Sequence, residues 1–136
     1  MKVSSHVCAI VLAVSLSGCA TTQYTPLAEA DEEQIEQLNV QIFRVEYRVS
    51  VFTSQEQLDA WLRRRCAELT IRQGYDYFHL SHRFDVLMLS RRTSMTVTMF
   101  KGELPAPASD FYDARTVLNQ ALEHSQDATH NQRVRG

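Results

Sequence analysis

The chain has few of the residues that build common catalytic and nucleotide-binding loops. It contains four glycines among 136 residues, so a glycine-rich loop that cradles phosphate is difficult to build. Neither such a loop, nor a nucleophile elbow, nor a paired-carboxylate motif is found in the sequence. Basic and acidic residues nearly balance, with 14 Lys and Arg against 16 Asp and Glu. This composition argues against nucleic-acid binding, which usually needs a strong positive balance to neutralise phosphates.

Long apolar runs are also missing. The most apolar stretch, residues 7–16, is too short for a permanent membrane-spanning helix, which needs about 20 residues. It follows the basic residue Lys2 and precedes small residues. This order is typical of a secretory signal peptide, so we expect residues 1–18 to be removed from the mature protein.

The residues at the end of this segment match a known pattern. Leu16-Ser17-Gly18-Cys19 resembles the lipobox of bacterial lipoproteins. The resemblance implies that Cys19 receives a diacylglycerol and that the signal is cleaved between Gly18 and Cys19. It also implies stable anchoring, because two or three acyl chains hold a protein on a membrane where one binds marginally. Ala20 resembles the class directed to the outer membrane, whereas Asp there retains lipoproteins in the inner membrane. A soluble secreted protein with a coincidental Cys19 is the alternative.

The three cysteines then have separate fates. Cys8 leaves with the signal and Cys19 is blocked by lipid, so Cys66 is the free thiol of the mature chain and no internal disulfide forms. A nucleophilic cysteine needs a lowered pKa and a neighbouring base, and the sequence around Cys66 supplies neither. Its place on an apolar helix face favours a buried, small hydrophobic side chain.

Composition divides the rest of the chain into three parts. Residues 19–36 are expected to form a lipidated N-terminus and a flexible tether, because they are polar and include Pro26 and an acidic cluster. Residues 37–124 carry the periodic apolar patterns of a globular domain. Residues 125–136 lack apolar content, so we expect a disordered tail.

Hydrophobic periodicity predicts the elements of the domain. Residues 39–52 alternate apolar and polar side chains, which indicates a half-buried strand. A helix follows, with Ser54 as its N-cap, Gln57 in a capping box and Gly74 at its C-terminal end. The apolar face of that helix consists of Leu58, Trp61, Leu62, Cys66 and Leu69.

Further strands and a second helix complete the prediction. We expect strands at residues 75–82, with a continuation at 84–89, and at residues 91–102. Asp110 is expected to cap a final helix whose apolar stripe runs over residues 111–122. The predicted fold is therefore a small single α+β domain: a strand, a long helix, two or three antiparallel strands and a C-terminal helix, with both helices on one face of the sheet.

A second resemblance concerns the mature chain. The stretch RCAELTIRQGYDYF, residues 65–78, is similar to the signature of an uncharacterised family of proteobacterial envelope lipoproteins, in which Ala-Glu-Leu-Thr is followed by Gly-Tyr-Asp and aromatic residues. Cys66 departs from the pattern, which has Ala there. The stretches FRVEYRV and YDARTVL resemble the first strand and the C-terminal helix of that family. The family carries no established activity, so the resemblance implies a fold and a location but no mechanism.

Several side chains in the signature are candidates for a structural or interaction role. Arg65 falls in the middle of the apolar helix face, where its stem can pack while its head reaches water. Pairing with a buried carboxylate, Asp76 or Asp113, is the alternative. Asp76 itself is expected to stabilise a turn or to pair with an arginine. Glu68 is expected to be solvated.

The aromatic residues that flank Asp76 complete the candidate cluster: Tyr75, Tyr77 and Phe78. A metal site is not expected nearby. His79 and His82 would share a helix face, but on a strand they point to opposite faces, and zinc needs further ligands.

The predicted function is a lipid-anchored envelope lipoprotein on the periplasmic leaflet of the outer membrane, with a non-enzymatic structural or protein-interaction role. Its expected partners are the membrane, through the lipid on Cys19, and an envelope protein that contacts an edge strand or an aromatic-rich surface. No nucleic acid and no cofactor is expected. The alternative is a periplasm-facing module that binds a small apolar or lipid ligand between the helices and the sheet.

Overall fold

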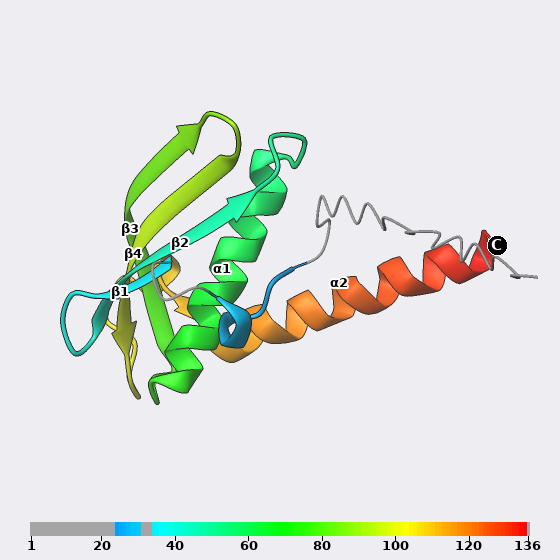
Figure 1. Ribbon diagram of the computed structural model, residues 1–136. Coiled ribbons are helices and arrows are strands. Elements are labelled where there is room, and N and C mark those ends of the chain that lie inside the picture. Colours follow the sequence, from blue (N-terminus) through cyan, green and yellow to red (C-terminus); the bar gives the residue numbers. More distant parts are fainter. Residues whose placement is uncertain (1–23, 31–33, 136) are drawn as a thin grey trace, which may run out of the picture.

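One long helix lies across an antiparallel sheet, and a second helix extends away from it (Figure 1). The computed structural model describes residues 24–30 and 34–135. The elements in that part of the chain are η1 (Leu27–Glu29), β1 (Ile35–Gln37), β2 (Ile42–Val49), α1 (Gln55–Arg72), β3 (Tyr77–Leu87), β4 (Arg91–Phe100), η3 (Ala108–Asp110), β5 (Tyr112–Asp113) and α2 (Ala114–Val134). The fold is the α+β architecture that the sequence predicts.

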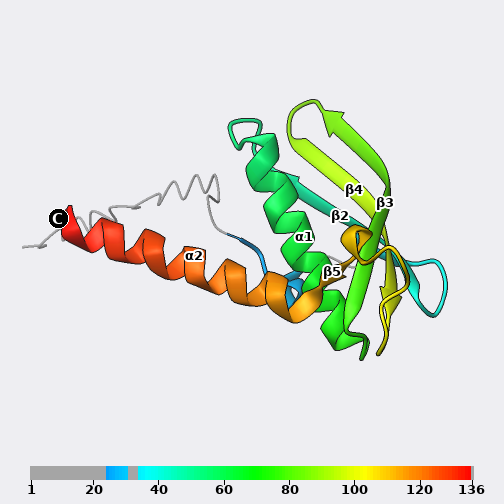
Figure 2. The same cartoon turned by 180° about the vertical axis from the view of Figure 1, so that it is seen from behind.

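The strands of the described residues form a single five-stranded antiparallel sheet in the order β1-β2-β4-β3-β5. β4 lies in the centre, between β2 and β3. Helix α1 carries the chain from β2 to β3, two strands away, and covers one face of the sheet on the way. β5 pairs with two residues at the start of β3 and leads into α2 (Figure 2).

The hydrophobic core lies between α1 and the sheet. The predicted alternation of β2 places Phe43, Val45, Tyr47 and Val49 against the helix, all of them buried. The facing helix positions Leu58, Leu62, Cys66 and Leu69 are buried as well, which is the apolar face predicted from the sequence. Each fully buried Leu, Val or Phe contributes about 1.5–3 kcal/mol relative to exposure, so this interface is the main source of stability.

The ends of α1 are those that its sequence indicates. The Ser54 hydroxyl accepts a hydrogen bond from the Gln57 amide at 3.1 Å, which satisfies one of the free amides of the first turn. Gly74 follows the helix with φ +83, a left-handed conformation that glycine adopts without steric cost. Local residue chemistry therefore determines where this helix starts and stops.

Strand β3 contains a β-bulge. Its register against β4 shifts between Ser81 and Phe84, and His82 has φ 50. The extra residue exchanges the two faces of the strand beyond this point. As a result, Phe84 pairs with Ser94 on the open face of the sheet, and Asp85 pairs with the buried Thr93 on the face toward α1.

Helix α2 packs against α1, on the same side of the sheet, and differs from the prediction at both ends. Its N-cap is Asp113, whose carboxylate accepts from the Thr116 amide at 3.0 Å, and the expected cap Asp110 lies in η3 instead. The helix also continues to Val134, where a disordered tail was predicted from residue 125. Packing of its first turns nucleates the helix, and each further residue then needs only to add one hydrogen bond.

Candidate functional site

Arg65 is the largest side chain that is fully enclosed in the domain, with 2% of its surface exposed. Its guanidinium donates to the Gln34 side-chain oxygen at 2.6 Å, to the Glu46 carbonyl at 3.0 Å and to the Thr25 carbonyl at 3.0 Å. It also lies 4.2 Å from the centre of the Tyr47 ring, in cation–π geometry.

The expectation that Arg65 reaches water is therefore wrong. The alternative pairing with Asp76 or Asp113 is also not observed, because the three acceptors are uncharged oxygens. Their positions explain the difference. Two of them belong to the segment before β2, which folds back over α1 and closes the path that the arginine head would take to solvent.

Glu68 is one helical turn further along α1 and binds the same segment. One of its carboxylate oxygens accepts from the Tyr24 hydroxyl at 3.0 Å and from the Leu27 amide at 2.8 Å. The Arg64 guanidinium is 3.5 Å from the other oxygen and stacks 4.1 Å from the centre of the Tyr24 ring. The prediction that Glu68 is solvated is wrong, because the carboxylate satisfies donors that would otherwise be buried.

Aromatic contacts complete this arrangement. The Tyr24 ring stacks on Tyr47 with centroids 5.8 Å apart, and Tyr47 packs against Trp61. The Thr25 amide donates to the Tyr47 hydroxyl at 2.8 Å. Burial, reinforced by the negative charge of Glu68, raises the pKa of the Tyr24 hydroxyl far above its usual range, so it remains a hydrogen-bond donor at any physiological pH.

We call this arrangement the N-terminal clamp: Tyr24, Thr25 and Leu27, held by Tyr47, Arg65 and Glu68. Leu27 is 4% exposed, and the tyrosine and threonine are half-buried. The structure thus differs from the flexible tether expected over residues 19–36, because residues 24–30 and 34–36 belong to the folded domain. The aromatic and apolar residues of the stretch YTPL, residues 24–27, were the available sequence signal for this contact.

Asp76 joins three elements of the fold. Its amide donates to the Phe100 carbonyl at 2.9 Å, its carbonyl accepts from the Ala114 amide at 3.0 Å, and its carboxylate accepts from the Gly102 amide at 3.0 Å. Asp76 therefore fastens the start of β3 to the end of β4 and to the start of α2. Of the two roles expected for Asp76, stabilising a turn and pairing with an arginine, these contacts correspond to the first.

The aromatic neighbours of Asp76 serve the core more than the surface. Phe78 is fully buried and stacks on Tyr112 with centroids 5.2 Å apart. Tyr75 and Tyr77 are half-buried, one at each side of Asp76. The structure therefore does not bring these residues together with Arg65 into one site.

The remaining reactive side chains occupy ordinary structural positions. Cys66 is a buried free thiol, and burial raises its pKa to about 12, which suppresses the reactive thiolate. His79 packs against Phe111 with ring centroids 5.6 Å apart, and His82 lies in the bulge. Among the described residues, no group of three or more His, Cys, Asp or Glu is arranged to hold a metal ion.

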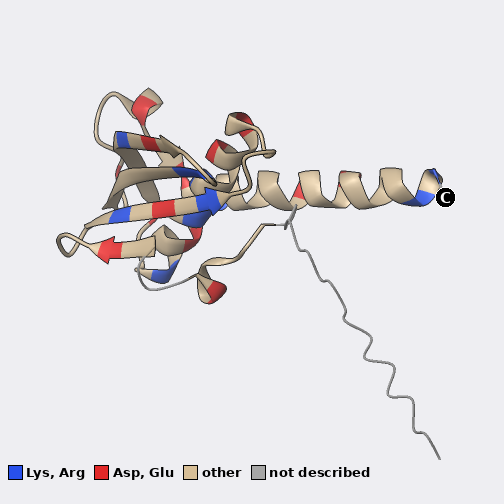
Figure 3. Ribbon diagram, turned by 45° about the horizontal axis from the view of Figure 1, so that its top comes forward, with Lys and Arg blue, Asp and Glu red and all other residues tan. Residues whose placement is uncertain are grey.

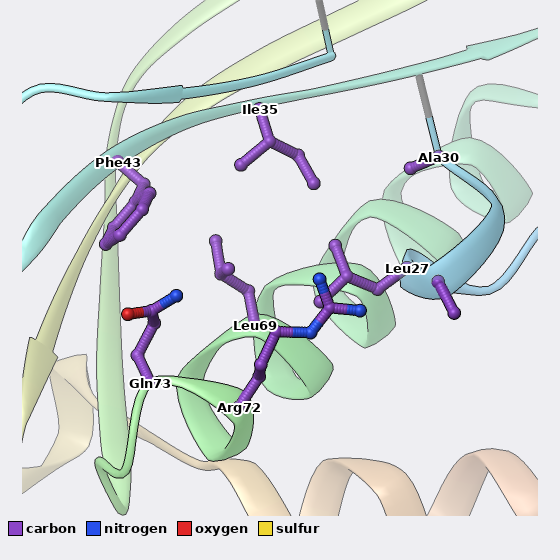
Figure 4. Close-up of a pocket in the computed structure, with 8 residues that line it drawn as sticks. Leu27, Ala30, Ile35, Phe43, Leu69, Arg72 and Gln73 are labelled. Atoms are coloured by element: carbon purple, nitrogen blue, oxygen red, sulfur yellow. The ribbon is translucent and has the colours of Figure 1, made fainter. Parts of the chain in front are cut away.

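A hollow of about 570 Å³ lies near the C-terminal end of α1, as Figure 4 shows. Its apolar lining consists of Leu27, Ala28, Ala30, Ile35, Phe43 and Leu69, and Arg72 and Gln73 stand at its rim. Residues 31–33, between Ala30 and Gln34, lie outside the described residues. The hollow is thus an open depression at the side of the core and is separate from the clamp contacts of Arg65.

The predicted lipidation and cleavage residues, Cys19 and Gly18, lie outside the described residues. In the described part of the chain, no helix is both long and apolar enough to cross a membrane. Comparison with known proteins found no match to this chain, neither among family models, nor among curated proteins, nor among solved structures.

Proposed function

We propose that this chain is a lipid-anchored envelope protein on the periplasmic leaflet of the outer membrane, with a non-enzymatic structural or protein-interaction role. The observation that carries the proposal is the N-terminal clamp. Four residues separate Cys19, the expected lipid carrier, from the clamped Tyr24. A domain that hangs from its N-terminus needs a firm attachment there, and Arg65 and Glu68 supply it from the middle of the core helix.

A labelling experiment tests the anchor. Cells that express the full chain are grown with a fatty-acid probe, and the protein is isolated and examined for label. We expect label on the wild type and none on Cys19→Ser. Label retained on Cys19→Ser, or absent from the wild type, contradicts the anchoring proposal. Separation of inner and outer membranes in the same cells tests the location.

The proposed protein contact is carried by the projecting part of α2. Every residue after Ala121 in that helix is exposed, and the 13 residues from Leu122 to Val134 extend about 20 Å. Figure 3 shows that most of the helix carries no charge. Its charged residues are Arg115, Glu123, Asp127 and Arg133.

The composition of this segment supports a partner. Ser, Thr, Asn and His are weak helix formers, so the exposed part of α2 is only marginally stable even though it continues from the packed first turns. Two hydroxyls bond back to the carbonyls of the helix itself, Ser125 to Ala121 and Thr129 to Ser125, which adds little to stability. A surface that covers the segment would stabilise it substantially.

Site-specific cross-linking in intact cells tests this contact. A photo-reactive amino acid is placed at Gln126 on the projecting helix, with Val40 in the β1–β2 turn as a matched exposed control. We expect a discrete cross-linked protein from Gln126, identified by mass spectrometry, and none of that species from Val40. Recovery of only monomer and lipid refutes the protein-interaction role.

The hollow beside Leu69 supports a second candidate, a module that binds a small apolar or lipid ligand. Its apolar lining next to Arg72 and Gln73 would suit an acyl chain with a polar head. If so, purified protein in native mass spectrometry should carry a lipid in addition to its covalent anchor, and Ile35→Lys, a change at a half-buried lining residue, should release it. A wild-type spectrum without added mass excludes this candidate.

A further inference from the structure

One end of the domain carries the most exposed apolar residues of the described chain. Leu89, Phe52 and Met88 are 98%, 94% and 78% exposed, and Leu87 beside them is 63% exposed. Met88 and Leu89 lie in the β3–β4 turn, Leu87 is the last residue of β3, and Phe52 lies in the β2–α1 turn, which is distant in sequence. We call these four residues the apolar end.

Strand register places the two turns together. Arg91, the first residue of β4, pairs with Leu87 on one side and with Val49, the last residue of β2, on the other. Both turns therefore leave the sheet at the same end, as both views of the fold show (Figures 1 and 2). Four large apolar side chains thus project from one end.

A polar network holds this end in place. The Arg83 guanidinium donates to both carboxylate oxygens of Asp59 on α1, at 2.9 and 3.1 Å, and to Asp85 at 2.7 Å. The Thr93 hydroxyl donates to Asp85 at 2.6 Å, and Gln55 on α1 donates to the same hydroxyl oxygen at 3.0 Å. These bonds brace the hairpin against α1, so the apolar side chains are presented to solvent by a fixed support.

This region is poorly suited to binding a protein partner by strand addition. The outer edge of β3 beyond Phe78 is the open edge on that side, within the residues described, but the bulge at His82 interrupts it. Bulges and charged residues on an edge are devices that discourage pairing with another strand, and Arg83 follows the bulge directly. A partner that binds the apolar end without pairing to a strand edge therefore fits this region better than an added strand.

The length of the chain before the clamp indicates what this partner is. Cys19 is five residues before Tyr24 and can lie up to about 18 Å from it. Tyr24 stacks on Tyr47, which pairs with Thr93 on β4. Ser90 in the apolar end's turn is three residues from Thr93, about 10 Å along the strand. One membrane surface can therefore contact both the lipid on Cys19 and the apolar end.

We propose that the apolar end docks into the headgroup region of the same bilayer that holds the lipid anchor, so that the domain is attached at two points and has a fixed orientation. The inference rests on the proposed lipid anchor. The charge of the β3–β4 side suits a lipid surface, since no acidic residue occurs between Val86 and Gly102 and two arginines, Arg91 and Arg92, follow the turn. On the Phe52 side, Glu56 in the first turn of α1 is the acidic residue nearest in sequence. Apolar side chains with flanking cations are the usual composition of an interfacial contact.

Quenching by lipid tests the proposal on the full, lipidated chain. An environment-sensitive fluorophore is attached to Met88→Cys or to the control Val40→Cys, which lies at the opposite end of the sheet and is 70% exposed. The proteins are reconstituted in vesicles of phosphatidylethanolamine and phosphatidylglycerol that contain a spin-labelled lipid. We expect the fluorophore at position 88 to shift to the blue and to lose most of its emission, with little change at position 40.

A second variant makes the result specific. Leu89→Asp places a charge on a fully exposed position, so the fold is unaffected, and it should reduce quenching at position 88 to the level of position 40. Equal quenching at both positions, or quenching that Leu89→Asp leaves intact, overturns the proposal. So does the capture of a protein by a photo-reactive residue at position 88 in place of lipid quenching.

The fatty-acid content of the same preparations separates this proposal from the one on which it rests. Protein that carries the lipid but shows no quenching at position 88 overturns the docking of the apolar end and leaves the anchor standing. Protein without any lipid on Cys19 overturns both.

Discussion

Removal of the Arg65 side chain is the most direct test of the clamp. In Arg65→Ala, the Thr25 and Glu46 carbonyls and the Gln34 side chain lose a charged donor that is 2% exposed in the native fold. Each buried acceptor left without a partner costs about 1–3 kcal/mol, and the emptied space adds to the loss. We expect the free energy of unfolding to fall by about 3–5 kcal/mol, which is typical of a disrupted buried network.

Urea unfolding measures this loss through Trp61, the single tryptophan of the chain, whose ring lies 5.8 Å from that of Tyr47. With a denaturant slope of about 1.5 kcal/mol per M, the midpoint should fall by about 2–3 M. Arg65→Lys keeps the charge but cannot reach three acceptors at once, so an intermediate loss of about 1–3 kcal/mol is expected.

The matched control is Arg44→Ala. Arg44 is 2.7 Å from Glu36, but both side chains are more than half exposed, at 52% and 58%. Such a surface pair contributes less than about 1 kcal/mol, so the midpoint should move little. If Arg65→Ala unfolds at the same urea concentration as Arg44→Ala, the guanidinium is not part of the stabilising structure and the reasoning on the clamp is wrong.

Three further predictions concern single side chains. Glu68→Gln keeps the shape of the clamp but weakens its bonds to the N-terminal segment, so proteolysis of that segment in the native protein should accelerate about tenfold, matching a loss of about 1.4 kcal/mol. Hydrogen bonds from Arg83 hold the pKa of Asp85 below its usual range, so the stability that the ionised carboxylate adds is complete above about pH 5 and is lost as pH falls through the lowered pKa. This pH-dependent stability should be absent from acid-unfolding curves of Asp85→Asn. Cys66, with its pKa near 12, should react with a thiol reagent at pH 8 at least about a hundredfold more slowly in folded than in urea-unfolded protein.

The parts of the fold that depend on neighbours in sequence were predictable. The alternation of β2 and the spacing of the apolar residues of α1 identify both elements and the faces that they bury. The Ser54 cap and Gly74 mark the ends of α1, because capping involves residues only three or four positions apart.

The clamp was not predictable in the same way. Glu68 lies outside the apolar arc of α1, and the partners that bury it are 41 and 44 residues away. Arg65 has the same difficulty, since its acceptors lie 19, 31 and 40 residues away. A polar residue on a helix has a solvated and a buried alternative, and only the tertiary contacts decide between them.

The prediction for the C-terminal end of α2 was wrong for a different reason. Residues 125–134 have little apolar content to pack, so the sequence indicates disorder. The helix nevertheless begins at Ala114, which is fully buried, and is fixed by the packing of Val117 and Leu118. Once that first part is formed, the rest continues from it, which a reading of residues 125–134 alone does not reveal.

The separation between Tyr24 and Glu68 also determines the order of events during synthesis. A chain made from its N-terminus exposes the Tyr24–Leu27 segment long before its partner exists, because Glu68 follows Tyr24 by 44 residues. Until α1 is complete, the segment lacks the side chains that hold it in the native fold. The clamp can therefore close only after Glu68 has been synthesised, so the N-terminal segment joins the domain later than its place in the sequence suggests.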